Sequence, residues 1–295
     1  MRRLIVLASA LALAFAAVGP ANAHHVEFPS ELDGTLETLP DGGTPQAAGD
    51  DADIHSDNMF LVSNFDDGGT YRTGSDLAFW GNRLVAGSLP AGTEAGGFRL
   101  LDISNPAAPT ETGQFACRSN QGDVSTWKNL VFVSVDSPVD RPECAGAVSA
   151  STTQVTLGQA YEGIRVVSVA DPANPQQVAF VDTDCGSHTH TLVPDEPNGR
   201  VLLYVLSYPL NGQSGECNAE SHRKVSVVEV PLKNPAAARV IATPDVSPAI
   251  GCHDVTVFTG LELAAAACIS ESQMWDISES ANPRIISRIV NPAIN

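Results

Sequence analysis

A short motif that occurs four times along the chain is the feature that most constrains its fold. The motif is an apolar run, a small polar step and a proline-rich turn, as in "LDISNPAAP" at 101–109. It recurs as "VVSVADPANP" at 166–175, loosely as "VVEVPLKNP" at 227–235, and as "WDISESANP" at 275–283. Because proline cannot donate to a strand ladder, each copy predicts a turn between two strands. The recurrence therefore indicates a chain built from repeated supersecondary units.

Four units can be aligned around this motif, at about 75–117, 122–184, 188–246 and 253–290. In each unit, four runs of Val, Leu, Ile and Phe are separated by Gly, Pro, Asn and Asp, which is the pattern of short β-strands. No segment has helical period and length, and "LELAAAAC" at 261–268 is predicted to be a strand because the repeat requires one there. Four strands per unit predict an all-β fold, a β-propeller with four recognisable blades. A large β-sandwich is the alternative.

The repeats also resemble a known family. The segments "GFRLLDISNPAAP", "GIRVVSVADPANP" and "SQMWDISESANP" are similar to LVIVD repeats, found in exported bacterial and archaeal proteins, and "GSDLAFWGNRLVAGS" is similar to the start of the first repeat of that family. The resemblance covers about residues 59–290, but Glu229 stands in the third unit where Asp is usual, and Pro231 interrupts its turn. It implies a propeller and no reaction, because the matching residues are strand and turn formers.

The N-terminal residues are predicted to lie outside the propeller. Residues 1–23 have a basic start, an apolar run and small residues before a cleavage point, which predicts a secretory signal peptide. Residues 24–58 are acidic, without Lys or Arg, and predict a flexible leader. The segment "NMFLVSNF" at 58–65 resembles an outer fourth strand with no first three strands before it. The propeller is therefore expected to be incomplete, with a four-bladed ring as the alternative.

The signal peptide predicts a secreted or cell-surface protein, and the charge and the loop composition indicate which partners it could have. No later segment is apolar and long enough to cross a membrane after signal cleavage. The net charge of −18 disfavours nucleic acid as a partner. The loops at 137–160 and 208–223 are rich in small and polar residues, as recognition loops are. The first functional hypothesis is a non-enzymatic binding or scaffold module whose partner is an unidentified protein or glycan.

The six cysteines predict disulfides, since the chain is expected to be exported. In each of three successive cases, one cysteine precedes the first strand of a unit and another follows its second strand. The predicted pairs are Cys117–Cys144, Cys185–Cys217 and Cys252–Cys268.

Histidines and aspartates stand at the start of the first strand of each unit. In a propeller these starts lie near the central axis, so their side chains are expected to converge at one mouth of the channel. Imidazole and carboxylate suit Zn, Cu, Fe or Mn, which makes a divalent transition metal the candidate cofactor. The candidate ligands are His188, His190, His253, Asp254, Asp123 and Asp76. The second functional hypothesis is therefore a metal-dependent enzyme; the alternative is that these residues cap strands or bond the next blade.

Other sequence signals add no chemistry. The nucleophile elbow, the P-loop, the dinucleotide fingerprint and the H-E-x-x-H motif are absent, so no catalytic residue is assigned. Trp80 and Trp127 occupy equivalent places in successive units and predict packing between blades.

Overall fold

The computed structural model describes residues 62–63, 65, 74–89, 96–119, 121–183, 185–208 and 222–291. The predicted signal peptide and acidic leader lie outside these residues. Of the segment at 58–65, the described residues Val62, Ser63 and Phe65 belong to no strand. Within the described ranges, no helix has the length and apolar character that a membrane span requires.

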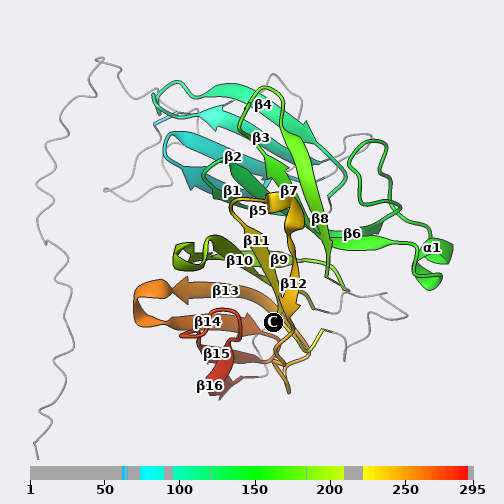
Figure 1. Cartoon of the computed structure of the whole chain (residues 1–295), viewed down its shortest axis with the longest axis vertical. Coiled ribbons are helices and arrows are strands. Elements are labelled where there is room, and N and C mark those ends of the chain that lie inside the picture. Colours follow the sequence, from blue (N-terminus) through cyan, green and yellow to red (C-terminus); the bar gives the residue numbers. More distant parts are fainter. Residues whose placement is uncertain are drawn as a thin grey trace, which may run out of the picture. The chain divides into compact units, whose positions relative to one another are not determined.

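Four antiparallel sheets of four strands each make up the described part of the chain (Figure 1). The first contains β1 (Gly74–Trp80), β2 (Arg83–Ser88), β3 (Gly97–Asp102) and β4 (Thr110–Ala116). The second contains β5 (Gln121–Trp127), β6 (Leu130–Val139), β7 (Tyr161–Ser168) and β8 (Gln176–Asp182). The third contains β9 (Thr189–Asp195), β10 (Arg200–Leu206), β11 (Ser226–Pro231) and β12 (Arg239–Ala242). The fourth contains β13 (Cys252–Phe258), β14 (Leu263–Cys268), β15 (Glu271–Asp276) and β16 (Arg284–Val290).

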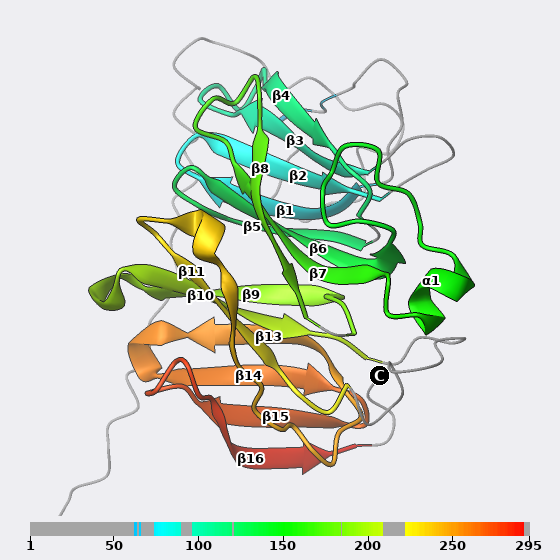
Figure 2. The ribbon, with the colours of Figure 1, turned by 45° about the vertical axis from the view of Figure 1, so that its right-hand side comes forward.

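The sheets are the blades of a β-propeller, and they follow one another in chain order (Figure 2). The first strands of successive blades, β1, β5, β9 and β13, contact one another in turn. Within each blade, every strand is hydrogen-bonded to the strands that precede and follow it in sequence, so the fourth strand lies farthest from the first. The four described blades do not close into a ring. The predicted all-β propeller of four-stranded blades is therefore confirmed, and the sandwich is excluded.

The recurrent motif joins the third and fourth strands of each blade. Asp102 and Asp276 end the third strands of the first and last blades, and Oδ1 of each accepts a backbone N–H two residues later, at 2.8 and 2.9 Å. This Asx turn reverses the chain. All four pairings of third and fourth strands also contain an irregularity in register. The repetition in sequence is thus a repetition of one corner.

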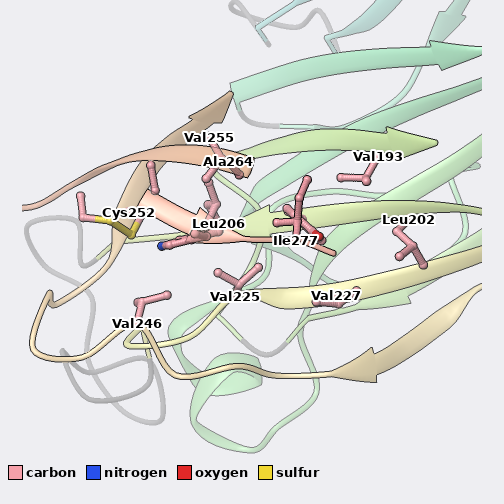
Figure 3. Packing of buried hydrophobic residues seen from close by; sticks show 14 of the residues in the cluster. Val193, Leu202, Leu206, Val225, Val227, Val246, Cys252, Val255, Ala264 and Ile277 are labelled. Carbon is pink, nitrogen blue, oxygen red and sulfur yellow. A yellow bond between two sulfur atoms is a disulfide. The ribbon is translucent and has the colours of Figure 1, made fainter. Parts of the chain in front are cut away.

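The hydrophobic core lies between blades. One cluster joins the first and second blades, a second joins the second and third, and a third joins the third and fourth. In the last of these, Leu202 and Val227 of the third blade face the same cluster as Val255 and Ala264 of the fourth (Figure 3). The rings of Trp80 and Trp127 lie 5.0 Å apart between centroids, which confirms their packing across the first interface.

Short helical segments interrupt the β pattern. A helix, α1 (Thr152–Thr156), was not expected from the sequence; it forms because Ser151 and Gln154 make a capping box at its start. The 3₁₀ turns η1 (Glu196–Asn198), η2 (Pro235–Ala237) and η3 (Thr259–Leu261) lie in connections between strands. The alanine-rich run at 261–268 forms η3 and then β14, so the strand predicted there is confirmed.

Two of the predicted disulfides are present, Cys117–Cys144 and Cys252–Cys268. Cys185 is buried, but Cys217 lies outside the described residues. The pair Cys185–Cys217 stays a prediction.

Candidate functional site

Polar side chains gather in two clusters where neighbouring blades meet at the ends of their inner strands. The His190 network consists of Asp76, Asp123, Ser125, Ser134, Ser187 and His190. The His188 cluster consists of Asp136, His188, Tyr208 and His253. The candidate ligands predicted from the sequence divide between these clusters, apart from Asp254.

The His190 network is centred on a ring with no exposed surface. Nδ1 of His190 lies 2.9 Å from Oδ2 of Asp123 and 2.9 Å from Oγ of Ser134, and Nε2 lies 2.7 Å from Oγ of Ser125. The same Asp123 oxygen accepts the backbone N–H of His190 at 2.8 Å. Every polar atom of the imidazole therefore has a partner inside the protein.

Asp76 and Asp123 have the same role in successive blades. Oδ2 of Asp76 accepts the N–H of Val124 in β5 at 3.1 Å, as Asp123 accepts that of His190 in β9. Burial raises the pKa of Asp76, and the nearby Asp123 carboxylate adds to the rise. Burial also acts to raise the pKa of Asp123, but the charge and hydrogen bonds of His190 outweigh it and lower that pKa. Each aspartate fastens its blade to the next.

Ser125, His190 and Asp123 are bonded in the order of a Ser-His-Asp triad, an order that the sequence spacing did not indicate. Such a triad needs a serine that a substrate can reach and an imidazole that can exchange its proton. Here the histidine ring is fully enclosed, and Ser134 is a second partner of its Nδ1. We therefore assign the His190 network to the joining of three blades.

The His188 cluster has a different geometry. The rings of His188, His253 and Tyr208 lie side by side, and a polar atom of each of the other two rings lies near Nε2 of His188. Nδ1 of His188 lies 2.8 Å from Oδ2 of Asp136. Nε2 of His188 lies 3.2 Å from Nε2 of His253 and 3.2 Å from the hydroxyl oxygen of Tyr208. The ring centroids of His188 lie 4.7 Å from those of His253 and 4.5 Å from those of Tyr208.

Backbone features of three blades bring the cluster together. Asp136 lies in β6 within an irregularity of its pairing with β7, and such irregularities redirect side chains. His188 immediately precedes β9, where its N–H donates to the carbonyl of Leu206 at 2.8 Å. Thr189 donates its hydroxyl hydrogen bond to the carbonyl of His253, which fixes the start of β13 beside β9. The second, third and fourth blades each contribute at least one member.

Burial is uneven across the cluster. The side chains of Asp136 and His188 are 4 % and 9 % exposed, whereas Tyr208 and His253 are half-buried. Burial raises the pKa of Tyr208, and the charge of Asp136 adds to the rise. The Asp136–His188 pair is thus the enclosed side of the cluster, and the two other rings form its side toward solvent.

The cluster includes two residues that the sequence analysis missed and leaves out one that it proposed. Asp136 interrupts a valine-rich run, and this was its signal in the sequence. Tyr208 follows β10, whose end pairs with the start of β9 beside His188. Asp254 is exposed, and its carboxylate accepts the N–H of Val255 in its own strand at 2.7 Å.

The convergence of nitrogen and oxygen atoms is compatible with a bound cation. When the His188 ring is neutral and its Nδ1–H donates to Asp136, Nε2 presents a single lone pair, which cannot serve two donors well. Two nitrogen ligands about 2.0–2.1 Å from a tetrahedral metal lie roughly 3.3–3.4 Å apart, close to the 3.2 Å between His188 and His253. A carboxylate behind a histidine ligand is common in metal sites. The described residues contain no group of three or more His, Cys, Asp or Glu so placed.

Comparisons with known proteins support the fold. No family model matches the chain, and no curated protein matches it, so the LVIVD assignment stays a prediction. The periplasmic gluconolactonase of Pseudomonas aeruginosa is similar in structure at 12 % identity, with a TM-score of 0.52 over 75 % of this chain and 59 % of that one. Its similarity is to the propeller fold.

Two further solved structures were found at lower similarity. A putative 6-phosphogluconolactonase of Bacteroides fragilis has 10 % identity and a TM-score of 0.43, covering 68 % of this chain and 50 % of that one. A hypothetical selenium-binding protein of Sulfolobus tokodaii has 11 % identity and a TM-score of 0.46, covering 74 % and 49 %. This chain matches between 49 % and 59 % of the length of the three structures.

Proposed function

We propose that this protein is an exported β-propeller that binds one transition-metal ion at the His188 cluster and uses it in catalysis. The observation that carries the proposal is the 3.2 Å separation of the Nε2 atoms of His188 and His253. The second functional hypothesis from the sequence is thereby favoured over the binding scaffold. His188 and His253 are the two histidine ligands in this proposal. His190, Asp123 and Asp76 instead join blades.

Neighbouring groups orient the two histidine ligands of the proposed centre. Asp136 holds the proton on Nδ1 of His188, so that Nε2 keeps its lone pair and its direction. The hydrogen bond from Thr189 fixes the backbone of His253, and the disulfide at Cys252 ties the same end of β13 to β14. When bound, the metal ion supplies a Lewis acid that can polarise a substrate or activate a water molecule.

The proposed location outside the cytoplasm has separate support. Two disulfides occur in the described chain, and disulfides persist mainly in oxidising compartments. The predicted signal peptide at 1–23 agrees with export.

Elemental analysis of the exported protein tests the proposal. The chain should be purified from an oxidising compartment without a polyhistidine tag, and the variants His188→Ala and His253→Gln measured beside it. We expect about one metal ion per chain in the unaltered protein and loss of most of it in both variants. Metal-free unaltered protein that also fails to bind added Zn²⁺, Cu²⁺, Fe³⁺ or Mn²⁺ would overturn the proposal.

Two controls separate this site from adventitious binding. Asp254→Asn changes a charge beside His253 without touching the cluster, and it should retain the metal. The double variant His24→Ser, His25→Ser removes the histidines of the predicted mature N-terminus and should also retain it. Loss of metal in the second control would assign binding to the N-terminus and refute the site.

A further inference from the structure

We infer that Tyr208 is a third ligand, bound through its phenolate oxygen, and that the metal is therefore Fe³⁺ or Cu²⁺ rather than Zn²⁺. This inference rests on the proposed function, because it concerns the same centre. The candidate ligands taken from the sequence were histidines and aspartates, so the tyrosine is an addition made by the structure.

The position of the phenol supports the assignment. Its oxygen lies 3.2 Å from Nε2 of His188, the same distance that separates Nε2 of His188 from Nε2 of His253. The Tyr208 ring stacks on the His253 ring, with 24° between their planes and 5.4 Å between centroids. Stacking holds the phenol ring alongside the imidazole of His253, while the phenol oxygen lies beside Nε2 of His188.

Hydrogen bonding alone accounts poorly for this arrangement. A neutral His188 ring with its Nδ1 proton directed to Asp136 can accept one hydrogen bond at Nε2, yet two groups lie 3.2 Å away. Both distances are at the long end for hydrogen bonds to nitrogen or oxygen. A cation between the three atoms would bind all of their lone pairs at once.

The backbone at Gly251 packs closely against Tyr208. Gly251 has φ of +143°, a conformation that side chains disfavour. A Cβ at this position would lie 2.6 Å from the carbonyl oxygen of Ser207, 2.8 Å from Cα of Tyr208 and 2.9 Å from its Cβ. Glycine thus lets the segment leading to His253 lie directly against Tyr208. Backbone in sparsely populated regions is often found at ligand-binding sites.

The ligand set determines the class of metal. Imidazole suits Zn, Cu, Fe and Ni alike, so the two histidines do not discriminate. A phenolate is a hard anionic oxygen donor, and it favours Fe³⁺ and Cu²⁺. On binding, the phenol O–H bond breaks, its proton passes to solvent, and the oxygen forms a bond to the metal without any change in oxidation state.

Visible absorption distinguishes this ligand set from one of histidines alone. Phenolate transfers charge into the partly filled d shell of Fe³⁺ or Cu²⁺ and gives a coloured complex, whereas Zn²⁺ has a filled d shell and gives none. Metal-free full-length protein should be titrated with each ion, alongside Tyr208→Phe. Tyr161→Phe, whose ring lies 6.3 Å from that of Phe180, is the matched control.

The expected result is an intense visible charge-transfer band with Fe³⁺ or Cu²⁺ in the unaltered protein and in Tyr161→Phe. Tyr208→Phe should still bind metal, with affinity lower by about tenfold or more, and should lack the band. A complex without the charge-transfer band, or a charge-transfer band of equal intensity in Tyr208→Phe, would overturn the inference and leave the two-histidine centre standing. If the unaltered protein binds none of Zn²⁺, Cu²⁺, Fe³⁺ and Mn²⁺, the proposed function fails and this inference fails with it.

Discussion

Removal of one carboxylate from the His190 network should weaken the whole propeller. In Asp123→Ala, the backbone N–H and the Nδ1–H of His190 lose their common acceptor, which lies at 2.8 and 2.9 Å from the two nitrogens. Both donors lie between the second and third blades. Since the blades are held together by such contacts and by the apolar clusters between them, the loss is expected to lower the stability of the fold and not only of one loop.

The magnitude follows from the number of donors left behind. A buried donor without a partner costs about 1–3 kcal/mol. The backbone N–H of His190 loses its acceptor outright, whereas Nδ1 keeps Oγ of Ser134 at 2.9 Å as a second partner. The unsatisfied N–H costs about 1–3 kcal/mol and the hydrogen bond lost at Nδ1 about 1 kcal/mol more, so we expect Asp123→Ala to lower the free energy of unfolding by about 2–4 kcal/mol. Asp254→Ala, at an exposed position, should change it by no more than about 0.5 kcal/mol.

Urea titration of the two variants and the unaltered protein at neutral pH measures this difference. A shift of the midpoint with an unchanged m-value reports a change in stability. If Asp123→Ala differs from Asp254→Ala by less than about 1 kcal/mol, the assignment of the His190 network to blade joining is wrong.

The same comparison has a predicted pH dependence. The pKa of Asp123 is lowered in the folded protein, so its carboxylate stabilises the fold above the unfolded-state pKa of about 3.9. This contribution is lost as the pH falls through the lower folded-state pKa. The stability difference between the unaltered protein and Asp123→Ala should therefore shrink as the pH falls below about 4. A difference that does not shrink as the pH falls below about 4 would contradict the lowered pKa of Asp123.

Three further substitutions test other parts of the structure. Arg165→Ala should lower the free energy of unfolding by about 3 kcal/mol in urea titration. The buried guanidinium lies 5.0 Å from the Phe180 ring centroid and donates to backbone carbonyls. Arg165→Met, which fills part of the same space, should recover part of the loss. Replacement of both Cys252 and Cys268 by Ala should cost about 3 kcal/mol, measured by thermal unfolding, since the bridge closes a short loop; an unchanged midpoint would argue against the bridge. Gly251→Ala should cost more than about 1 kcal/mol and weaken metal binding in titration, because its backbone has φ of +143°; retention of both properties would show that the close approach is dispensable.

The blades and two of their disulfides could be predicted because their signals are local in sequence. Strand periodicity and turn residues such as Asp102 and Asp276 act within one blade, and the two cysteine pairs join residues only 27 and 16 positions apart in sequence. Their repetition reinforced each signal. The helix α1 was missed because its signal is a single capping box at Ser151 in an otherwise irregular loop.

The grouping of the polar residues, by contrast, depended on the tertiary structure. Asp76, Asp123 and Asp254 stand at similar places in the sequence repeat, yet the first two accept an N–H from the next blade while Asp254 is exposed. Among the described residues no further blade follows the one that contains Asp254. A local sequence pattern does not show whether an aspartate has a hydrogen-bond donor on another blade.

The sequence by itself determined the four-stranded unit, its turn and the residues available for chemistry. The stacking of blades decided which of them meet. It placed Asp136 at Nδ1 of His188, and His253 and Tyr208 at Nε2 of the same ring. The physical reason is that strand and turn formation depend on neighbours along the chain, whereas a site between blades depends on side chains such as His188 and His253, which lie 65 residues apart in sequence.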